Sequence, residues 1–230
     1  MNLLLAVGFS ATFLFRPASC ASDAYSGGNQ TNLSPIPLRL PAPSFHSGPR
    51  RIDADPHTES RPELPRPPFL APIGTTNLAF HRKVTSSDTN CGTTTLARIT
   101  DGDKDEDEPS MVTLHTGKQW VQIDLEDLCS VYAVVIWHRE YRDRVFHCIA
   151  VQTAEDAAFT RNVHTLFNND YANLLGLGTG SDQQYYERYE GKLIDAKGVK
   201  ARYVRCYSKG NTDDGLNWYR EVEVWGLRGK

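Results

Sequence analysis

The sequence carries little excess charge of either sign. Its 230 residues contain 25 Lys and Arg against 28 Asp and Glu, which gives a formal net charge of −3. Without a basic field, electrostatic attraction to nucleic acid or to an anionic membrane surface is not expected. We therefore expect no nucleic-acid partner.

Motifs of the common enzyme classes are also missing. The chain has no Gly-x-Ser-x-Gly elbow and no His-Glu-x-x-His pair, and the glycines of residues 176–180 lack the Lys-Ser/Thr of a phosphate loop. Glu187 and Glu190 form a carboxylate pair, which glycosidases require. Two Glu in a polar segment are more often solvated charges, so the sequence predicts a protein that is not an enzyme.

Cysteine is scarce, and none of the five stands in a CxxC element, so a structural zinc site is not expected. Four of them lie far from the N-terminus, and in an oxidising compartment they form two disulfides in any of three pairings. The sequence does not choose among the pairings. These four are Cys91, Cys129, Cys148 and Cys206.

Residues 1–21 are typical of an export signal. Leu3 to Phe15 is an apolar run too short to span a bilayer, and small residues follow in Ala18 to Ala21. The pattern predicts a secreted, cell-surface or periplasmic protein. A lipid on Cys20 is one alternative and would give the only membrane attachment that we expect. An ordinary buried segment is the other, because no Lys or Arg precedes Arg16.

Proline is concentrated in one segment. Eleven of the thirteen prolines lie in residues 22–72, with only three aromatic residues among them. Such a composition does not bury enough apolar surface to offset the entropy of ordering. We therefore expect a disordered or polyproline-like linker over residues 22–72.

Short apolar runs separated by Gly, Asn and Asp begin at about residue 73, and long helical periodicity is absent. Val121, Ile123 and Leu125 alternate with polar residues, which is typical of a half-buried strand. Several short strands of this kind predict a sandwich or a jelly roll. The runs are Trp120–Leu125, Tyr132–Trp137, Val145–Val151, Arg202–Tyr207 and Glu221–Trp225.

Six motifs in residues 73–230 follow one another in a particular order: Asn77–Ala79, Ile99–Asp103, Gln119–Leu125, Val134–His138, Ala201–Arg205 and Glu221–Gly226. In order and spacing they resemble the discoidin or F5/8 type C domain. The galactose-binding-like superfamily to which it belongs includes fucose-binding lectins and family 32 carbohydrate-binding modules. The resemblance implies an all-β fold, an antiparallel eight-stranded jelly-roll β-sandwich with binding loops at one end. Cys206 stands where the family has an aliphatic residue, so a buried free thiol is the alternative to a disulfide there.

The resemblance also implies a carbohydrate-binding module. Lectins of the superfamily hold sugar hydroxyls with a His and two Arg, because guanidinium groups present rigid paired donors, while an aromatic ring stacks on the sugar. The alternative is that Arg139 and Arg144 form surface ion pairs with neighbouring acids, and His115 competes with His138 for the histidine role. The candidate ligand-binding residues are His138, Arg139, Arg142, Arg144 and Trp218.

The expected partner is a glycan or a cell-surface glycoconjugate. A protein-protein adhesion or scaffolding domain on the same fold is the alternative, because a fold does not fix a function.

An acidic loop follows residue 100, where six carboxylates fall within eight positions. Ca²⁺ prefers oxygen ligands and would reduce their mutual repulsion. The resemblance implies a structural Ca²⁺ held there, and a solvated loop without an ion is the alternative. The implied ligands are the Arg98 carbonyl, Asp101, the Asp103 carbonyl, Ser110 and Glu221.

Overall fold

The computed structural model describes residues 32–43, 55–60, 64–105, 110–140 and 144–229. The residues from Asn32 onwards form one compact unit. The predicted export signal and Cys20 lie outside the described residues. No helix within the described ranges is long and apolar enough to cross a membrane.

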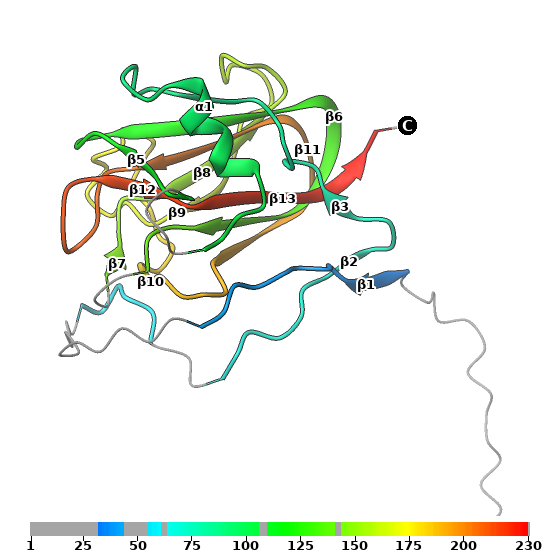
Figure 1. Ribbon diagram of the computed structural model, residues 1–230, viewed down its shortest axis with the longest axis horizontal. Helices are drawn as coiled ribbons and strands as arrows, with labels where there is room; N and C mark the ends of the chain where they lie inside the picture. Colours follow the sequence, from blue (N-terminus) through cyan, green and yellow to red (C-terminus); the bar gives the residue numbers. More distant parts are fainter. Residues whose placement is uncertain (1–31, 44–54, 61–63, 106–109, 141–143, 230) are drawn as a thin grey trace, which may run out of the picture. The chain divides into compact units, whose positions relative to one another are not determined.

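The unit is an all-β antiparallel sandwich, as predicted (Figure 1). Two short helices, α1 (Thr93–Leu96) and η1 (Ala97–Thr100), stand among its strands. The strands are β1 (Leu33–Pro35), β2 (Leu70–Pro72), β3 (Thr76–Asn77), β4 (Val84–Ser86), β5 (Val112–Leu114), β6 (Gln119–Trp137), β7 (Val145–Phe146), β8 (Ala150–Ala154), β9 (His164–Asn168), β10 (Tyr185–Tyr186), β11 (Lys192–Ser208), β12 (Asn217–Tyr219) and β13 (Glu221–Arg228).

Two long strands, β6 and β11, take part in both layers of the sandwich. The first half of β6 pairs with the second half of β11, and β4, β8 and β9 complete this first layer. The second half of β6 pairs with the first half of β11, and β13 and β3 complete the second layer. Register shifts in β11 between Asp195 and Val199 and between Ala201 and Tyr203 mark the change of layer. The strand count exceeds eight because three short pairs, β1–β2, β5–β12 and β7–β10, stand beside the main sheet.

The main core lies between the two layers. Val121, Ile123 and Leu125 point into it from the first half of β6, as their alternation predicts, and Val134 and Ile136 point into it from the second half. All five side chains are fully buried. The residues that alternate with them therefore face outward, polar Gln122 and Asp124 in the first half of β6 and apolar Ala133, Val135 and Trp137 in the second half.

The four described cysteines are all free thiols, so the predicted disulfides among Cys91, Cys129, Cys148 and Cys206 are wrong. Cys129 and Cys206 belong to the main core, where they pack as small apolar side chains. The alternative of a buried free thiol at Cys206 is the one the structure shows.

The structure also corrects the linker prediction for residues 32–43 and 64–72, which we call the strap. Strand β1 pairs with β2, and Ile36 and Ala71 are buried against Trp137 and Trp225 of the second layer. These residues are ordered because the outer face of the second layer is apolar and has to be covered. Prolines are compatible with this pair, because a two-stranded edge leaves many N–H positions unused.

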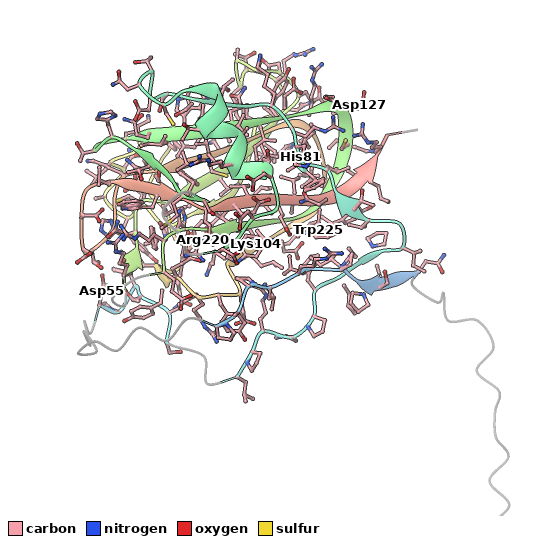
Figure 2. All side chains as sticks on the ribbon, in the orientation of Figure 1. Asp55, His81, Lys104, Asp127, Arg220 and Trp225 are labelled. Atoms are coloured by element: carbon pink, nitrogen blue, oxygen red, sulfur yellow. The ribbon has the colours of Figure 1, made fainter. Side chains whose placement is uncertain are left out.

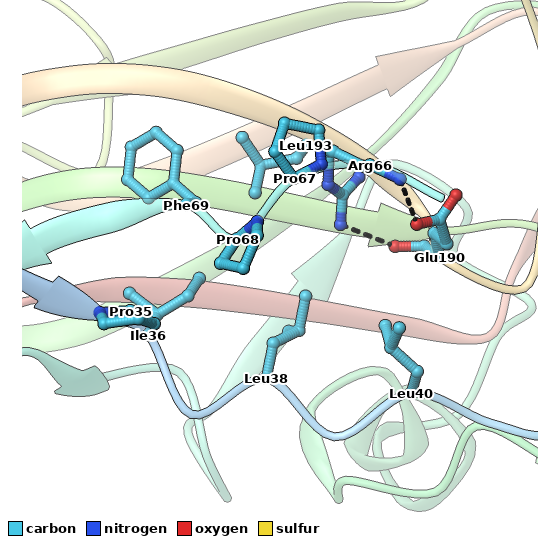
Figure 3. A pocket seen from close by; sticks show the side chains of 10 residues that line it. All are labelled: Pro35, Ile36, Leu38, Leu40, Arg66, Pro67, Pro68, Phe69, Glu190 and Leu193. Atoms are coloured by element: carbon cyan, nitrogen blue, oxygen red, sulfur yellow. Dashed lines mark hydrogen bonds between the residues drawn. The ribbon is translucent and has the colours of Figure 1, made fainter. Parts of the chain in front are cut away.

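A cavity of about 270 Å³ lies between the strap and β11 (Figure 3). Its walls are apolar at Leu38 and Phe69, and one end is closed by Arg66. The backbone N of Arg66 donates to Glu190 Oε1 (2.7 Å), and its guanidinium donates to the carbonyl of Gly191 (2.9 Å). The strap is thus fixed by polar contacts as well as by apolar packing.

Truncating the strap should destabilise the domain. Ile36→Ala removes a buried side chain that packs on the second layer, and we expect the free energy of unfolding to fall by about 2 kcal/mol in urea titrations. The matched control is Leu33→Ala, because Leu33 lies in the same strap but is 43% exposed. Equal stabilities for both variants would show that the strap does not belong to the folded unit.

Candidate functional site

Three of the predicted ligand-binding residues meet at strand β12. Trp218 lies in β12 opposite Thr113 of β5. The Arg139 guanidinium lies 4.5 Å from the Trp218 ring centroid, and that of Arg144 lies 5.8 Å from it. The structure therefore brings Arg139, Arg144 and Trp218 together, while Arg142 lies outside the described residues.

Two aspartates fix this cluster. Arg144 is almost fully buried, and its Nη2 pairs with Asp213 (2.8 Å) and Asp214 (3.1 Å). The Trp218 indole Nε1 donates to Asp214 Oδ1 (3.1 Å). Arg144 is thus ion-paired, as the alternative interpretation held, but with Asp213 and Asp214 from the loop before β12. The indole ring is held at its edge by Asp214, and guanidinium groups lie near its ring.

The assignment of His138 as a ligand-binding side chain is wrong, because the ring is buried. Its Nδ1 lies 2.6 Å from the Trp218 carbonyl, its Nε2 lies 3.0 Å from the Tyr185 hydroxyl, and it stacks on Phe146 at 4.3 Å. Burial lowers the pKa of His138 to about 4. The neutral imidazole is therefore a core group that holds the backbone of Trp218 in place.

His115, the competing histidine, is at the surface. It follows Thr113 by two residues on the outward side of the β5–β12 pair, and its side chain is 66% exposed. Its Nδ1 lies 2.8 Å from Asp88 Oδ2, while Asn217 Nδ2 donates to its carbonyl (2.6 Å). Of the two histidines, His115 is the one that can meet a ligand.

The expected calcium ligands lie around the turn after η1. The Glu221 carboxylate is fully buried: Oε2 accepts a hydrogen bond from the backbone N of Gly102 (3.1 Å), whereas Oε1 has no partner among the described residues. Burial raises the pKa of Glu221 to about 9, and the nearby carboxylates of Glu223 and Asp101 add to the rise. A cation beside Oε1 would offset the cost of burying this carboxylate next to Glu223 and Asp101.

The other implied ligands are oxygen donors of the same region. Arg98 lies in η1, and the Ser110 hydroxyl donates to Asp103 Oδ2 (2.8 Å). No three acidic, His or Cys side chains converge as a ready metal site in the described part of the chain. A set made only of oxygens, with one buried carboxylate oxygen unpartnered, nevertheless fits the ligand chemistry of Ca²⁺.

A buried lysine lies next to this carboxylate. Lys104 Nζ pairs with Glu223 Oε1 at 2.6 Å and lies 4.8 Å from the Trp137 ring centroid. The Arg220 guanidinium donates to the carbonyl of Lys104 (3.2 Å), and Figure 2 shows these residues together. Lys104 forms its ion pair with Glu223 and is also close enough to Glu221 to lower the pKa of that carboxyl, whereas Glu221 Oε1 accepts no hydrogen bond from the described residues.

A cysteine, a histidine and an aspartate also meet near β7, although not as a nucleophile with its base. His147 Nδ1 lies 3.4 Å from Cys148 Sγ. Burial raises the pKa of the Cys148 thiol to about 11, and Asp170 contributes to the rise. A thiol that is protonated at neutral pH is a poor nucleophile, so this cluster supports no covalent catalysis.

No family model matches the sequence, and no curated protein matches it. Among solved structures, the chain is similar to a chitosan-binding module from a chitosanase/glucanase of Paenibacillus sp. IK-5, with 19% identity over 66% of this chain and 99% of that one and a TM-score of 0.47. It is similar to a Streptococcus pneumoniae fucose binding module, with 19% identity over 68% and 98% and a TM-score of 0.45. A Clostridium perfringens CBM32 in complex with GlcNAc-α-1,4-galactose gives 15% identity over 67% and 96%, with a TM-score of 0.44. The ligands named are those of these proteins.

Buried His138 should make stability depend on acidity. Its folded pKa of about 4 lies below the usual 6.5, so its contribution to stability is complete above pH 6.5 and is lost as the pH falls toward 4, by about 3 kcal/mol in all. The gap in unfolding free energy between the wild type and His138→Gln should therefore narrow over this range. The control is exposed Leu33→Ala, which removes no titratable group, so its gap to the wild type should stay constant. A constant gap for His138→Gln would disprove a buried neutral imidazole.

Proposed function

We propose that this unit is a non-catalytic carbohydrate-binding module that binds glycan at the surface formed by Trp218 and Arg139, which the buried Arg144 supports. The observation that carries the proposal is the indole of Trp218, held at its edge by Asp214 with the Arg139 guanidinium 4.5 Å from its centroid. An oriented aromatic ring provides an apolar platform for a pyranose. The Arg139 guanidinium next to the ring provides donors for the sugar hydroxyls, whereas the buried Arg144 positions the ring through Asp214.

The mixture of donors and acceptors favours sugar over a protein partner. The partly exposed carboxylate of Asp213 offers an acceptor in the same cluster as the Arg139 guanidinium, and a hydroxyl group uses both roles. An adhesion surface would instead expose apolar side chains at this end. Of the nine large apolar side chains exposed in the described ranges, five lie in residues 33–73, in the strap or directly after it. Protein adhesion therefore stays the second candidate.

The proposal includes export. A module that binds glycans of other cells or of polysaccharides works outside the cell, and the apolar start of the sequence with its small residues supports a signal that is removed. N-terminal sequencing of the mature protein tests this: a first residue near Ser22 supports export, and an intact Met1 contradicts it.

A structural Ca²⁺ forms the second part of the proposal. Asp101, Glu221 and Ser110 would hold it, together with the carbonyls of Arg98 and Asp103. The ion would neutralise the buried carboxylate of Glu221 and join the loop after η1 to the first residue of β13. Its role is structural, because none of these residues belongs to the Trp218 cluster.

Removing the aromatic platform should abolish glycan binding. We expect Trp218→Ala in the full chain to weaken binding on a glycan array by about tenfold or more, as truncation of a central aromatic anchor does. Phe80→Ala is the matched control, because Phe80 is another exposed aromatic outside this cluster. No binding by the well-folded wild type would contradict the proposed function, and equal binding by both variants would contradict the proposed site.

Calcium should stabilise the wild type but not Glu221→Gln. Added Ca²⁺ should raise the melting temperature of the full chain, and a chelator should lower it, because an ion that binds only the folded state stabilises it by mass action. Glu126→Gln, an exposed carboxylate change, should leave the response intact. A wild-type melting temperature that does not respond to Ca²⁺ or to chelator would show that the ion is not bound.

A further inference from the structure

A second cavity lies on the outer face of the first layer. Its volume is about 220 Å³, and it is lined by Lys83, Thr85, Gln122, Asp124, Ala157 and Tyr203. Thr85 of β4 stands opposite Gln122 of β6, and Asp124 of β6 stands opposite Tyr203 of β11. Their side chains therefore lie side by side on one face of three neighbouring strands.

The amide of Gln122 is held in one orientation. Its Oε1 accepts hydrogen bonds from Nε (2.9 Å) and Nη2 of Arg205. Arg205 is itself fixed, because its guanidinium lies 3.9 Å from the Phe159 ring centroid and 4.6 Å from that of Trp120. With Oε1 committed to Arg205, the Nε2 group of Gln122, which makes no hydrogen bond within the described residues, is the donor left for the cavity.

The carboxylate of Asp124 is fixed in the same way. Nε and Nη2 of Arg202 donate to its two oxygens, at 2.8 and 2.9 Å. These hydrogen bonds hold the pKa of Asp124 below its usual range, so it remains an ionised acceptor. The backbone N of Glu126 also donates to Asp124 Oδ1 (2.8 Å), and the Tyr203 hydroxyl faces the same carboxylate. The floor of the cavity thus holds one fixed amide donor and one fixed, partly occupied carboxylate acceptor, with the hydroxyls of Tyr203 and Thr85 beside them.

We propose that this cavity is a second carbohydrate-binding site, which takes a single neutral sugar ring on the face of the sheet. The carboxylate of Asp124 would repel an anion, and the charged groups of Lys83 and Arg202 would repel a cation, so the cavity favours a neutral ligand. Adjacent hydroxyl groups use a fixed donor and a fixed acceptor together, and Tyr203 supplies an aromatic wall. Pockets for drug-sized ligands measure roughly 300–1,000 Å³, so the smaller cavity suits one ring.

This site uses no residue of the Trp218 cluster, so it is independent of the function proposed above. Two separate sites on one domain would let it hold one polysaccharide chain at two points, or two chains at once. Binding at two points raises the overall affinity without any new contact at either.

The test is a nuclear magnetic resonance titration of the full ¹⁵N-labelled chain with cellobiose, lactose and chitobiose. The side-chain amide of Gln122 reports on the sheet-face site, and the indole N–H of Trp218 reports on the other. We expect at least one disaccharide to shift the Gln122 amide in the wild type and also in Trp218→Ala. Thr85→Val and Tyr203→Phe should each weaken this binding about fivefold, as the loss of one hydrogen bond does. The control Tyr132→Phe, which removes a hydroxyl from the second layer, should leave this binding unchanged.

The outcomes separate the two sites. Shifts of the Trp218 indole alone would overturn the sheet-face site and leave the proposed function intact. Shifts of the Gln122 amide alone would support the sheet-face site and count against the Trp218 surface. A sulfate titration that moves the Gln122 amide as strongly as the sugars do would overturn the assignment to a neutral ring. No shift of either group would overturn both sites.

Discussion

The pairing of β6 with β11 is the constraint on which the rest of this structure depends. The two strands remain partners from Gln119↔Ser208 to Ile136↔Lys192, through both layers. Side chains alternate along a strand, so a slip of one residue would exchange the core row for the outer row. The register therefore places Val121 and Ile123 inside and Gln122 outside. It also brings the end of β6 to Trp218, because His138, directly after Trp137, lies 2.6 Å from the Trp218 carbonyl.

Trp137 links the strap, the buried charges and the candidate site. Its ring faces the strap residues, its Nε1 donates to the carbonyl of Tyr189 (2.9 Å), and its own carbonyl accepts from the backbone N of Arg220 (2.8 Å). A Cβ at Gly191 would lie 2.6 Å from the ring, and φ there is +65°, so only glycine allows this approach. The strap is held at the same point, because Arg66 donates to the carbonyl of Gly191.

The sequence predicted the strands whose pattern is long enough to read, and it missed features that depend on distant partners. The alternation of Val121, Ile123 and Leu125 was sufficient to predict a strand of the first layer and the side chains that it turns into the core. The strap was missed because β1 and β2 have three residues each, too few for a periodic signal among prolines. Likewise, the pairing of Arg144 with Asp213 joins residues from separate loops, which no local pattern reveals.

The histidine assignment shows a signal that was present in the sequence. Val134 and Ile136 point into the core, so the next residue of that row, His138, is inward by the same alternation. His115 continues the outward row of Thr113 by the same rule. The choice between the two histidines therefore follows from extending the strand pattern past its last apolar residue. A resemblance carried by short motifs gives the order of the strands but not the side on which each polar residue emerges.

The two outer faces differ in a way that bears on where ligands bind. The strap covers the apolar outer face of the second layer, whereas the outer face of the first layer is divided between an apolar cluster of Ala150, Leu175 and Tyr207 and the polar cavity around Gln122 and Asp124. A solvated polar face does not need fixed side chains. Fixing one long side chain costs up to about 2 kcal/mol in conformational entropy. Yet Arg205 is held between Trp120 and Phe159, and both Gln122 and Asp124 are tied by arginines. Side chains that are already fixed lose little further conformational entropy when a ligand binds. Such preorganisation distinguishes a recognition surface from a surface that is only soluble.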